Sequence, residues 1–355
     1  MRVAVIGSAG YPVIEPFAGG LEAHVWQLAN ALKARGHEIS LFAAPGSDPL
    51  LTRHDLSVPP LRLSAPARRD ASMTPESWLQ EHHAYLTLML WLHGPGACDF
   101  DVIHNHSLHH LPVAMAPALR TPMISTLHTP PTPWLESAVQ AARPSRIRFV
   151  AVSEYTARAW TAIPGPVGVI HNGIDTRRWK TGPGGAGLIW FGRITEEKGA
   201  HLAIEAARKA GRRLNLAGPI ADEAYFARKI APLLGEDIVY VGHLRHCELQ
   251  ELVGRSAATL VTPCWDEPYG LVVAESLACG TPVVAFARGG IPEIVTPECA
   301  VLVEGADTDG MADGIAAALL LSRSAARARA LSHCSSDDMV DAYCDLYREL
   351  AGAAT

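Results

Sequence analysis

Short apolar runs alternate with helical patterns in two series along this chain, and a glycine-rich segment separates the series. The first series extends over residues 2–170, where runs suited to buried strands are divided by stretches with helical spacing of apolar residues. The segment 181–187, Thr-Gly-Pro-Gly-Gly-Ala-Gly, shows neither pattern, and a second series starts at Leu188. Strands that alternate with helices form parallel, doubly wound sheets. The sequence therefore predicts an α/β protein with two domains, one on each side of the linker.

Length and composition agree with this division and exclude several classes of protein. A chain of 355 residues exceeds the roughly 250–300 residues beyond which a single core stops growing. The net charge of -6 offers no basic field for nucleic acid, and no apolar run reaches the ~18 residues of a membrane-spanning helix. The seven cysteines contain no Cys-x-x-Cys pair, which favours a reducing compartment. With no signal-peptide pattern before the first strand, we expect a cytoplasmic protein, a monomer or homodimer, without a nucleic-acid partner or an integral membrane segment.

The most informative motif is the stretch 267–284, Glu-Pro-Tyr-Gly-Leu-Val-Val-Ala-Glu-Ser-Leu-Ala-Cys-Gly-Thr-Pro-Val-Val. It predicts a turn, a helix over 271–278 and a left-handed cap at Gly280. The N–H groups of Gly270, Leu271 and Val272 would then lie free at the positive end of a helix, where anions bind. The carboxylates of Glu267 and Glu275, before the helix and on its second turn, would repel a phosphate, so they suit sugar hydroxyls on either side of one. A nucleotide-sugar presents its groups in this order.

This stretch resembles the Glu-x7-Glu signature of the retaining family 4 glycosyltransferases, and the resemblance extends over most of the chain. It implies the GT-B fold, with two Rossmann-like doubly wound domains that face each other across a cleft. The expected division is an acceptor-side domain over 1–168, a hinge over 169–187 and a nucleotide-sugar-binding domain over 188–335. The expected helix over 336–355 could cross back to the first domain.

Two cations lie in the loop that follows the predicted strand 188–191. The loop reads Gly-Arg-Ile-Thr-Glu-Glu-Lys-Gly and holds Arg193 and Lys198 at the sheet edge where phosphates bind. An arginine can bind phosphate oxygens with two parallel hydrogen bonds, whereas a lysine supplies a compact charge. Loop cations are commonly just solvated, but this pattern resembles the pyrophosphate-binding pair of the family.

The N-terminal series contributes a glycine pair and a histidine. Gly19 and Gly20 precede a helical pattern without the Gly-x-Gly-x-x-Gly spacing of dinucleotide-binding proteins. The pair can admit a ligand closely or simply turn the chain, and the resemblance implies a place near the donor phosphates and the acceptor. His128 follows the predicted strand 123–127, where a side chain points into the crevice of a parallel sheet. The resemblance implies that His128 contacts the donor hexose.

The remaining assignments come from the resemblance alone. Asn172 lies in a His-Asn-Gly-Ile-Asp stretch that marks the hinge in relatives, although Asn-Gly also favours a plain turn. The loop 241–244 corresponds to the segment that takes the nucleobase. The resemblance thus implies catalytic roles for His128, Arg193, Lys198 and Glu267, and donor contacts by Gly19, Gly20, Asn172, Arg193, Lys198, Val241, His243, Leu244, Glu267, Tyr269, Gly270, Leu271, Val272 and Glu275.

A cluster of histidines invites comparison with metal sites. His104, His106, His109 and His110 lie close together in the sequence, but no cysteine or carboxylate accompanies them at a usual ligand spacing. The Asp-Phe-Asp sequence at 99–101 matches the metal motif of the other large glycosyltransferase fold, but it comes just before a predicted strand. We therefore expect no metal site.

The resemblance implies a metal-independent, retaining hexosyltransferase with no cofactor besides its nucleotide-sugar co-substrate. We expect UDP-glucose as the donor, with GDP-mannose as the second choice, and a small molecule or saccharide as the hydroxyl acceptor. We expect the long connection over 45–75 to line the acceptor side, because specificity tends to lie on such loops. Two alternatives remain open: a nucleotide-sugar 2-epimerase of the same fold, and a non-catalytic nucleotide-sugar-binding subunit.

Overall fold

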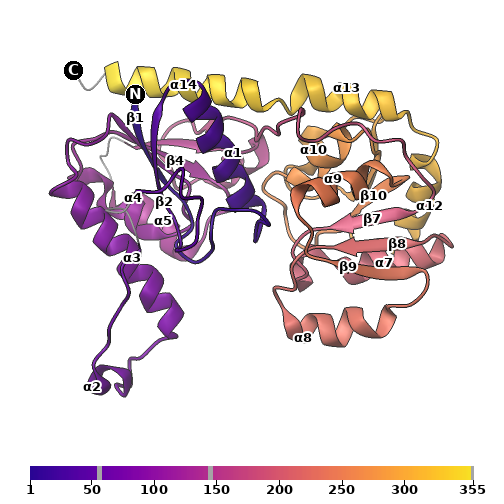
Figure 1. The fold of residues 1–355 in the computed structure, drawn as a ribbon, viewed down its shortest axis with the longest axis horizontal. Helices are drawn as coiled ribbons and strands as arrows, with labels where there is room; N and C mark the ends of the chain where they lie inside the picture. The colour runs from indigo at the N-terminus through magenta and orange to yellow at the C-terminus, as the bar shows by residue number, and fades with distance from the viewer. Residues whose placement is uncertain (54–57, 143–146, 353–355) are drawn as a thin grey trace.

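The computed structural model describes residues 1–53, 58–142 and 147–352, and it contains two six-stranded parallel sheets. Each sheet forms the centre of one lobe, and the two lobes lie side by side (Figure 1). The predicted α/β architecture of two doubly wound domains is confirmed. In the described residues no helix is long and apolar enough to cross a membrane.

The N-terminal lobe is built on a sheet with the strand order β2-β1-β3-β4-β5-β6. Its strands are β1 (Arg2–Ile6), β2 (Glu38–Phe42), β3 (Val102–Asn105), β4 (Met123–Leu127), β5 (Ile147–Ala151) and β6 (Gly168–Val169). Its helices are α1 (Gly20–Ala34), α2 (Ala65–Arg68), α3 (Glu76–His93), α4 (His110–Met115), α5 (Pro133–Ala141) and α6 (Glu154–Ala159). Helix α1 packs on the sheet because Val25, Leu28 and Leu32 share one face and are fully buried.

The C-terminal lobe has the strand order β12-β11-β10-β7-β8-β9. Its strands are β7 (Leu188–Phe191), β8 (Leu214–Ala217), β9 (Ile238–Gly242), β10 (Ala258–Val261), β11 (Val283–Phe286) and β12 (Ala300–Val303). Its helices are α7 (Ala200–Lys209), α8 (Glu223–Tyr225), α9 (His246–Gly254), α10 (Leu271–Ala278), α11 (Ile291–Ile294), α12 (Thr308–Ala318) and α13 (Arg323–His333). After α8, the chain continues as a π-helical segment, Phe226–Ile230, and a 3-10 turn, Ala231–Leu233. The last helix, α14 (Ser336–Gly352), follows α13.

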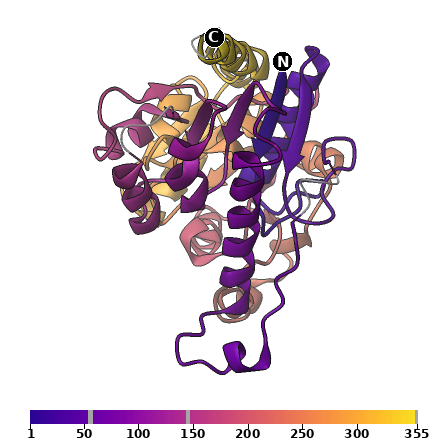
Figure 2. The same cartoon turned by 90° about the vertical axis from the view of Figure 1, so that its left-hand side faces the viewer.

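The connection between β2 and α3 forms an arm that leads away from the rest of the N-terminal lobe. Figures 1 and 2 show α2 near the tip of this arm, below the sheets, because the first turns of α3 extend beyond the lobe. No described residue of 45–75 lines the pocket between the lobes. The structure therefore gives no support to the expectation that this connection borders the acceptor side of the cleft.

Helix α13 was not predicted, because its sequence is rich in arginine and shows no clear apolar face. Its arginines bind backbone carbonyls rather than solvent. Arg323 Nη2 donates to the Gly254 carbonyl oxygen at 2.8 Å, and Arg327 Nη1 donates to that of Ala278 at 2.5 Å. Both carbonyls lie at the ends of helices, where the macrodipole favours a positive charge. The cations of α13 thus fix the ends of α9 and α10.

Helix α14 crosses from the C-terminal lobe to pack along the N-terminal lobe (Figure 1). Its fully buried Tyr343 and Tyr347 join the core formed by β1, β3 and α1. The Tyr347 hydroxyl lies 2.6 Å from His104 Nδ1, and the Tyr343 hydroxyl lies 3.1 Å from Thr126 Oγ1. Polar side chains buried in the N-terminal sheet are therefore satisfied by the last helix of the chain.

We expect Tyr347→Phe to lower the free energy of unfolding by about 1–3 kcal/mol, because it leaves a buried imidazole nitrogen without its partner. Urea unfolding followed by circular dichroism measures this loss. Tyr11→Phe is the matched control, since Tyr11 is 53% exposed and should tolerate the change. Equal stabilities of the two variants would contradict the structural role of the Tyr347 hydroxyl.

Candidate active site

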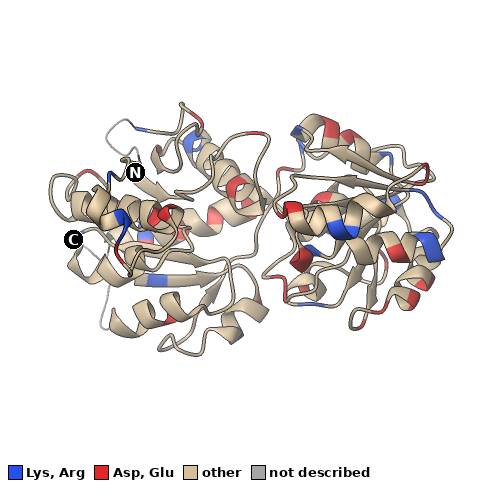
Figure 3. Cartoon of the chain, turned by 90° about the horizontal axis from the view of Figure 1, so that it is seen from below, with Lys and Arg blue, Asp and Glu red and all other residues tan. Residues whose placement is uncertain are grey.

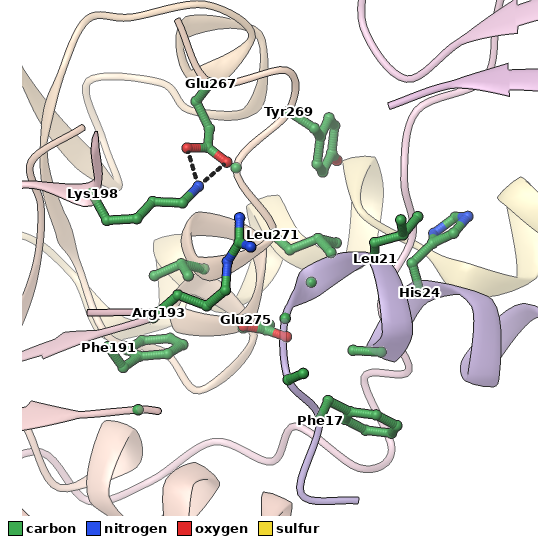
Figure 4. Close-up of a pocket in the computed structure, with 18 of the residues that line it drawn as sticks. Phe17, Leu21, His24, Phe191, Arg193, Lys198, Glu267, Tyr269, Leu271 and Glu275 are labelled. Carbon is green, nitrogen blue, oxygen red and sulfur yellow. Dashed lines mark hydrogen bonds and ion pairs between the residues drawn. The ribbon is translucent and has the colours of Figure 1, made fainter. Parts of the chain in front are cut away.

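A cavity of about 460 Å³ lies between the lobes, and both lobes supply its walls. The N-terminal lobe contributes the segment 16–21, α1 residues, Leu108 and His128. The C-terminal lobe contributes the β7–α7 loop, the segment 260–263 and the start of α10. Figure 4 shows these groups facing one another, with α1 opposite the charged residues of the C-terminal lobe. The cavity lies at the carboxyl ends of strands in both sheets, where doubly wound proteins bind ligands.

Lys198 and Glu267 form an ion pair in the wall of the cavity. Lys198 Nζ lies 2.6 Å from Glu267 Oε2 and 2.9 Å from Oε1 (Figure 4). Trp265 Nε1 donates to Glu267 Oε2 at 3.0 Å, and the Trp265 ring lies 4.9 Å from the lysine nitrogen. Both charged side chains are about four-fifths buried, with exposed fractions of 20% and 18%. The carboxylate is thus held in one orientation by two donors, and the ammonium keeps further N–H donors for a ligand.

Arg193 extends from the β7–α7 loop toward the glycine pair of the N-terminal lobe. Its Nη2 lies 3.3 Å from Glu197 Oε1, and the side chain is 39% exposed. A Cβ atom at Gly19 would lie 3.5 Å from Arg193 Cδ and only 3.1 Å from Glu22 Oε2. Burial raises the pKa of Glu22, and the Arg193 charge opposes this shift. The absence of a side chain at Gly19 therefore lets the guanidinium approach α1 across the cleft.

The start of α10 presents free N–H groups to the cavity. Gly270 precedes the helix with φ of 108°, a conformation that favours glycine. The N–H groups of Gly270, Leu271 and Val272 donate to no described residue. A Cβ atom at Gly20 would lie 3.2 Å from Leu271 Cδ1, so α1 and α10 approach closely here. This end of α10 combines unpaired donors with the positive end of the helix dipole.

Glu275 faces the cavity from the second turn of α10. No described residue donates a hydrogen bond or forms an ion pair with its carboxyl group, and burial raises the pKa of Glu275 to about 8. A carboxyl group in this state gains from any ligand that supplies hydroxyl donors.

Most of the other predicted residues line the cavity. His128, Asn172, His243 and Leu244 line it, and Asn172 Oδ1 is buried without a partner in the described residues. Tyr269 also lines it, but its ring is 2% exposed and belongs to the core of the C-terminal lobe. Val241 is not among the lining residues, because its side chain packs on the same core.

Comparison with known proteins places the chain in a family. Residues 18–178 match the family described as Glycosyltransferase Family 4, and residues 177–331 match Glycosyl transferases group 1. The glycogen synthase of Mycobacterium tuberculosis is 31% identical over 364 residues, which cover 90% of this chain and 86% of that protein. The chain belongs to the family 4 glycosyltransferases. A D-inositol 3-phosphate glycosyltransferase of Catenulispora acidiphila is 28% identical over 409 residues, covering 98% and 95% of the two chains.

Solved structures show that this glycosyltransferase has the GT-B fold. Sucrose-phosphate synthase of Thermosynechococcus elongatus aligns with a TM-score of 0.78 and 21% identity, covering 99% of this chain and 100% of that one. AviGT4, a glycosyltransferase involved in avilamycin A biosynthesis, aligns with a TM-score of 0.71 and 23% identity over 99% and 98%. HepE of Anabaena, solved with UDP-glucose, gives a TM-score of 0.76 and 19% identity over 98% and 100%.

Several lining residues of the glycosyltransferase were not predicted from its sequence. Trp265 lies only two residues before Glu267 in the sequence, and this proximity could have identified it as a lining residue. Arg178 lies over the Trp26 ring, 4.7 Å from its centroid, and also pairs with Glu15. His24 lies one helical turn after Gly20 and faces the same cavity (Figure 4). The contacts of Arg178 join segments far apart in sequence, so no local pattern reveals them.

The two lobes of the glycosyltransferase are joined beside the cavity by a carboxylate. Glu293 accepts hydrogen bonds from the backbone N–H groups of Glu154 at 2.8 Å and Tyr155 at 2.7 Å. These groups form the N-terminus of α6 in the other lobe, where a negative charge is favourable. Ser153 Oγ also donates to the Pro268 carbonyl oxygen at 2.5 Å. The C-terminal lobe thus caps a helix of the N-terminal lobe.

We expect Glu293→Gln to weaken closure of the lobes by about 1 kcal/mol, because the neutral side chain caps α6 less well. Small-angle X-ray scattering should then show a larger radius of gyration than for the wild type. Glu298→Gln, at an exposed position nearby, is the control and should leave the scattering unchanged. Identical curves for all three proteins would show that Glu293 does not hold the lobes together.

The pKa of Glu275 predicts a pH dependence of stability. Because the folded state raises this pKa from about 4.5 to about 8, it binds the proton more tightly than the unfolded state. The resulting stabilisation is complete below the unfolded pKa and is lost as the pH rises through the folded pKa. Glu275→Gln stays neutral, so its melting temperature relative to the wild type should increase between pH 5 and pH 8. Glu236→Gln, at an exposed position, should show no such trend, and a parallel trend in both variants would contradict the assignment.

Proposed function

We propose that this glycosyltransferase transfers a hexose from a nucleotide-sugar to a hydroxyl acceptor with retention of configuration and without a metal ion. The main support for this proposal is that Arg193, Lys198 and the free N–H groups of α10 all line one cavity. The carboxyl groups of Glu267 and Glu275 lie in the walls of the same cavity. Cations and helix N-termini together bind diphosphates, whereas carboxylates can accept hydrogen bonds from sugar hydroxyl groups. This combination matches a nucleoside diphosphate with a sugar at each end.

In the proposed complex the diphosphate lies between Arg193, Lys198 and the start of α10. Glu275 accepts hydrogen bonds from the ribose, and the segment 241–244 borders the nucleobase through its backbone. Glu267 and His128 orient the hexose near the N-terminal lobe. Lys198 can donate to the phosphate without leaving Glu267, because an ammonium group has three N–H donors. The ion pair would thus link the orientation of the sugar to the position of its leaving group.

The proposed reaction breaks the bond between the anomeric carbon and the diphosphate oxygen. The departing diphosphate gains negative charge, which Arg193, Lys198 and the N–H groups of α10 stabilise. The acceptor oxygen forms its new bond to the anomeric carbon on the same face. Its proton passes to the departing phosphate oxygen, so no separate protein base is required.

We propose UDP-glucose as the donor and GDP-mannose as the second choice, with a small molecule or a saccharide as the acceptor. One structural neighbour, HepE, is solved with UDP-glucose. Relatives named glycogen synthase and D-inositol 3-phosphate glycosyltransferase span both acceptor classes. In the view of Figure 3, acidic and basic residues are interspersed over both lobes.

The proposal can be tested with a panel of nucleotide-sugars. Each nucleotide-sugar is tested first for binding by thermal shift and then as a donor in a transfer assay. The expected donor raises the melting temperature, and proton NMR of the product should show the anomeric configuration of the donor. Nucleotide release without any acceptor would indicate an epimerase or hydrolase instead. Stabilisation by donors without turnover across a broad acceptor panel would indicate a binding subunit.

We expect Arg193→Ala, Lys198→Ala and Glu267→Ala each to lower kcat by about 100-fold or more, because each removes a group that stabilises the transition state. Melting temperatures should change little for Arg193→Ala, which is partly exposed. Lys209→Ala is the control, since its ion pairs with Glu205 and Asp309 lie outside the cavity. Rates near wild type in both cation variants would rule out the phosphate role.

A further inference from the structure

Three histidines from separate segments of the N-terminal lobe lie close together beside the cavity. His24 comes from α1, His106 follows β3 and His128 follows β4. One ring nitrogen of each lies within 4.8 Å of a nitrogen of each of the others. The ring centroids are 5.1 Å apart for His24 and His128, 5.3 Å for His24 and His106, and 5.2 Å for His106 and His128. The carboxyl ends of neighbouring strands and one turn of α1 thus bring three imidazoles together.

Two of these imidazoles, those of His24 and His106, are buried with nitrogens that lack partners in the described residues. His24 is 3% exposed, and neither of its ring nitrogens has a hydrogen-bond partner in the described residues. His106 is fully buried, and its Nε2 also lacks a partner, whereas its Nδ1 lies 2.9 Å from His128 Nε2. A buried polar atom without a partner costs free energy that a structural histidine would normally avoid. The unpaired nitrogens therefore point to a ligand.

We propose that His24, His106 and His128 bind a divalent transition-metal ion of the Zn²⁺ type. Neutral imidazole nitrogens are preferred ligands of such ions, whereas Mg²⁺ and Ca²⁺ prefer oxygen. Nitrogens bound to one tetrahedral ion lie roughly 3.4 Å apart, given Zn–N distances of about 2.0–2.1 Å. The candidate ligand nitrogens lie within 4.8 Å of one another, so the side chains would rotate to reach this spacing.

The fourth position of this ion would open into the cavity. His24 and His128 line the cavity from the N-terminal lobe, whereas the ion pair of Lys198 and Glu267 lines it from the C-terminal lobe. A water or hydroxide on the ion would therefore occupy space beside His128. If the proposed function holds, this is the hexose end, and the ion inhibits transfer by displacing the sugar. The inhibition rests on the proposed function, whereas metal binding does not.

A second histidine group differs in its surroundings and provides a control. His82, His109 and His110 also have nitrogens within 4.8 Å of one another, but all three are half-buried and outside the cavity. His109 Nδ1 already accepts the Leu111 N–H at 3.2 Å. Because this group lies apart from the first, a substitution in it tests whether metal binding belongs to the cavity.

Cobalt provides a direct readout of the site without turnover. The full chain is stripped with EDTA, dialysed and titrated with Co²⁺, whose visible absorption bands are intense in tetrahedral nitrogen coordination. We expect these bands in the wild type and in His110→Phe, and their loss in His24→Phe. His24→Phe should fold well, because it removes two unpaired buried nitrogens and keeps a ring of similar shape. Should it fail to fold, His128→Gln must abolish the same bands.

A wild type without tetrahedral cobalt bands, or bands retained in His24→Phe, would overturn the metal site. The inhibitory role has its own test once a donor is known. Zn²⁺ should raise the KM for the donor in the wild type and in His110→Phe, and EDTA should reverse the effect. An unchanged KM in a zinc-loaded active enzyme would overturn the inhibition. An enzyme inactive with every donor would contradict the proposed function, while the cobalt spectrum still decides the metal site.

Discussion

The cavity depends on contacts between the lobes, and the hydrogen bonds of Glu293 to α6 are central among them. A pocket made from two separate sheets keeps its shape only while the sheets keep their relative position. One carboxylate satisfies two N–H groups at a helix N-terminus of the other lobe, which combines capping with a favourable dipole interaction. The two lobes also approach closely at Gly20 and Leu271, where a Cβ atom at Gly20 would lie 3.2 Å from Leu271 Cδ1. Because the hydrogen bonds of Glu293 lie outside both hydrophobic cores, ligand binding and closure can be coupled without disrupting either core.

Local sequence signals were sufficient for most of the fold. The strands β4 and β7 have the predicted bounds because short apolar runs between turn residues leave few alternatives. Helix α10 covers the predicted residues 271–278, because Gly270 and Gly280 both take positive φ and interrupt the helical conformation. Arg193 and Lys198 could be assigned to one edge of the sheet, because the carboxyl ends of parallel strands all lie at the same edge. These features depend on residues close together in sequence.

Other features depend on contacts that no local pattern contains. The pairing of Lys198 with Glu267 joins residues from different loops, and the sequence suggested separate roles for them rather than an ion pair. Helix α13 was missed because its arginines bind carbonyls of other segments instead of forming an amphipathic pattern. Val241 was assigned to the nucleobase loop through the backbone of that loop, and the packing of its side chain on the core follows from tertiary contacts that the loop sequence does not contain. His24 likewise lies near two histidines that follow different strands, His106 after β3 and His128 after β4.

The return of α14 to the N-terminal lobe has a consequence for biosynthesis. The side chains that satisfy His104 and Thr126 belong to residues 343 and 347, which leave the ribosome after the whole C-terminal lobe. Domains generally begin to fold as they are synthesised. Here the nascent N-terminal sheet must wait with an uncovered apolar surface and unpaired polar groups until translation of α14 is complete. During that interval the emerging polypeptide is a natural substrate for chaperones.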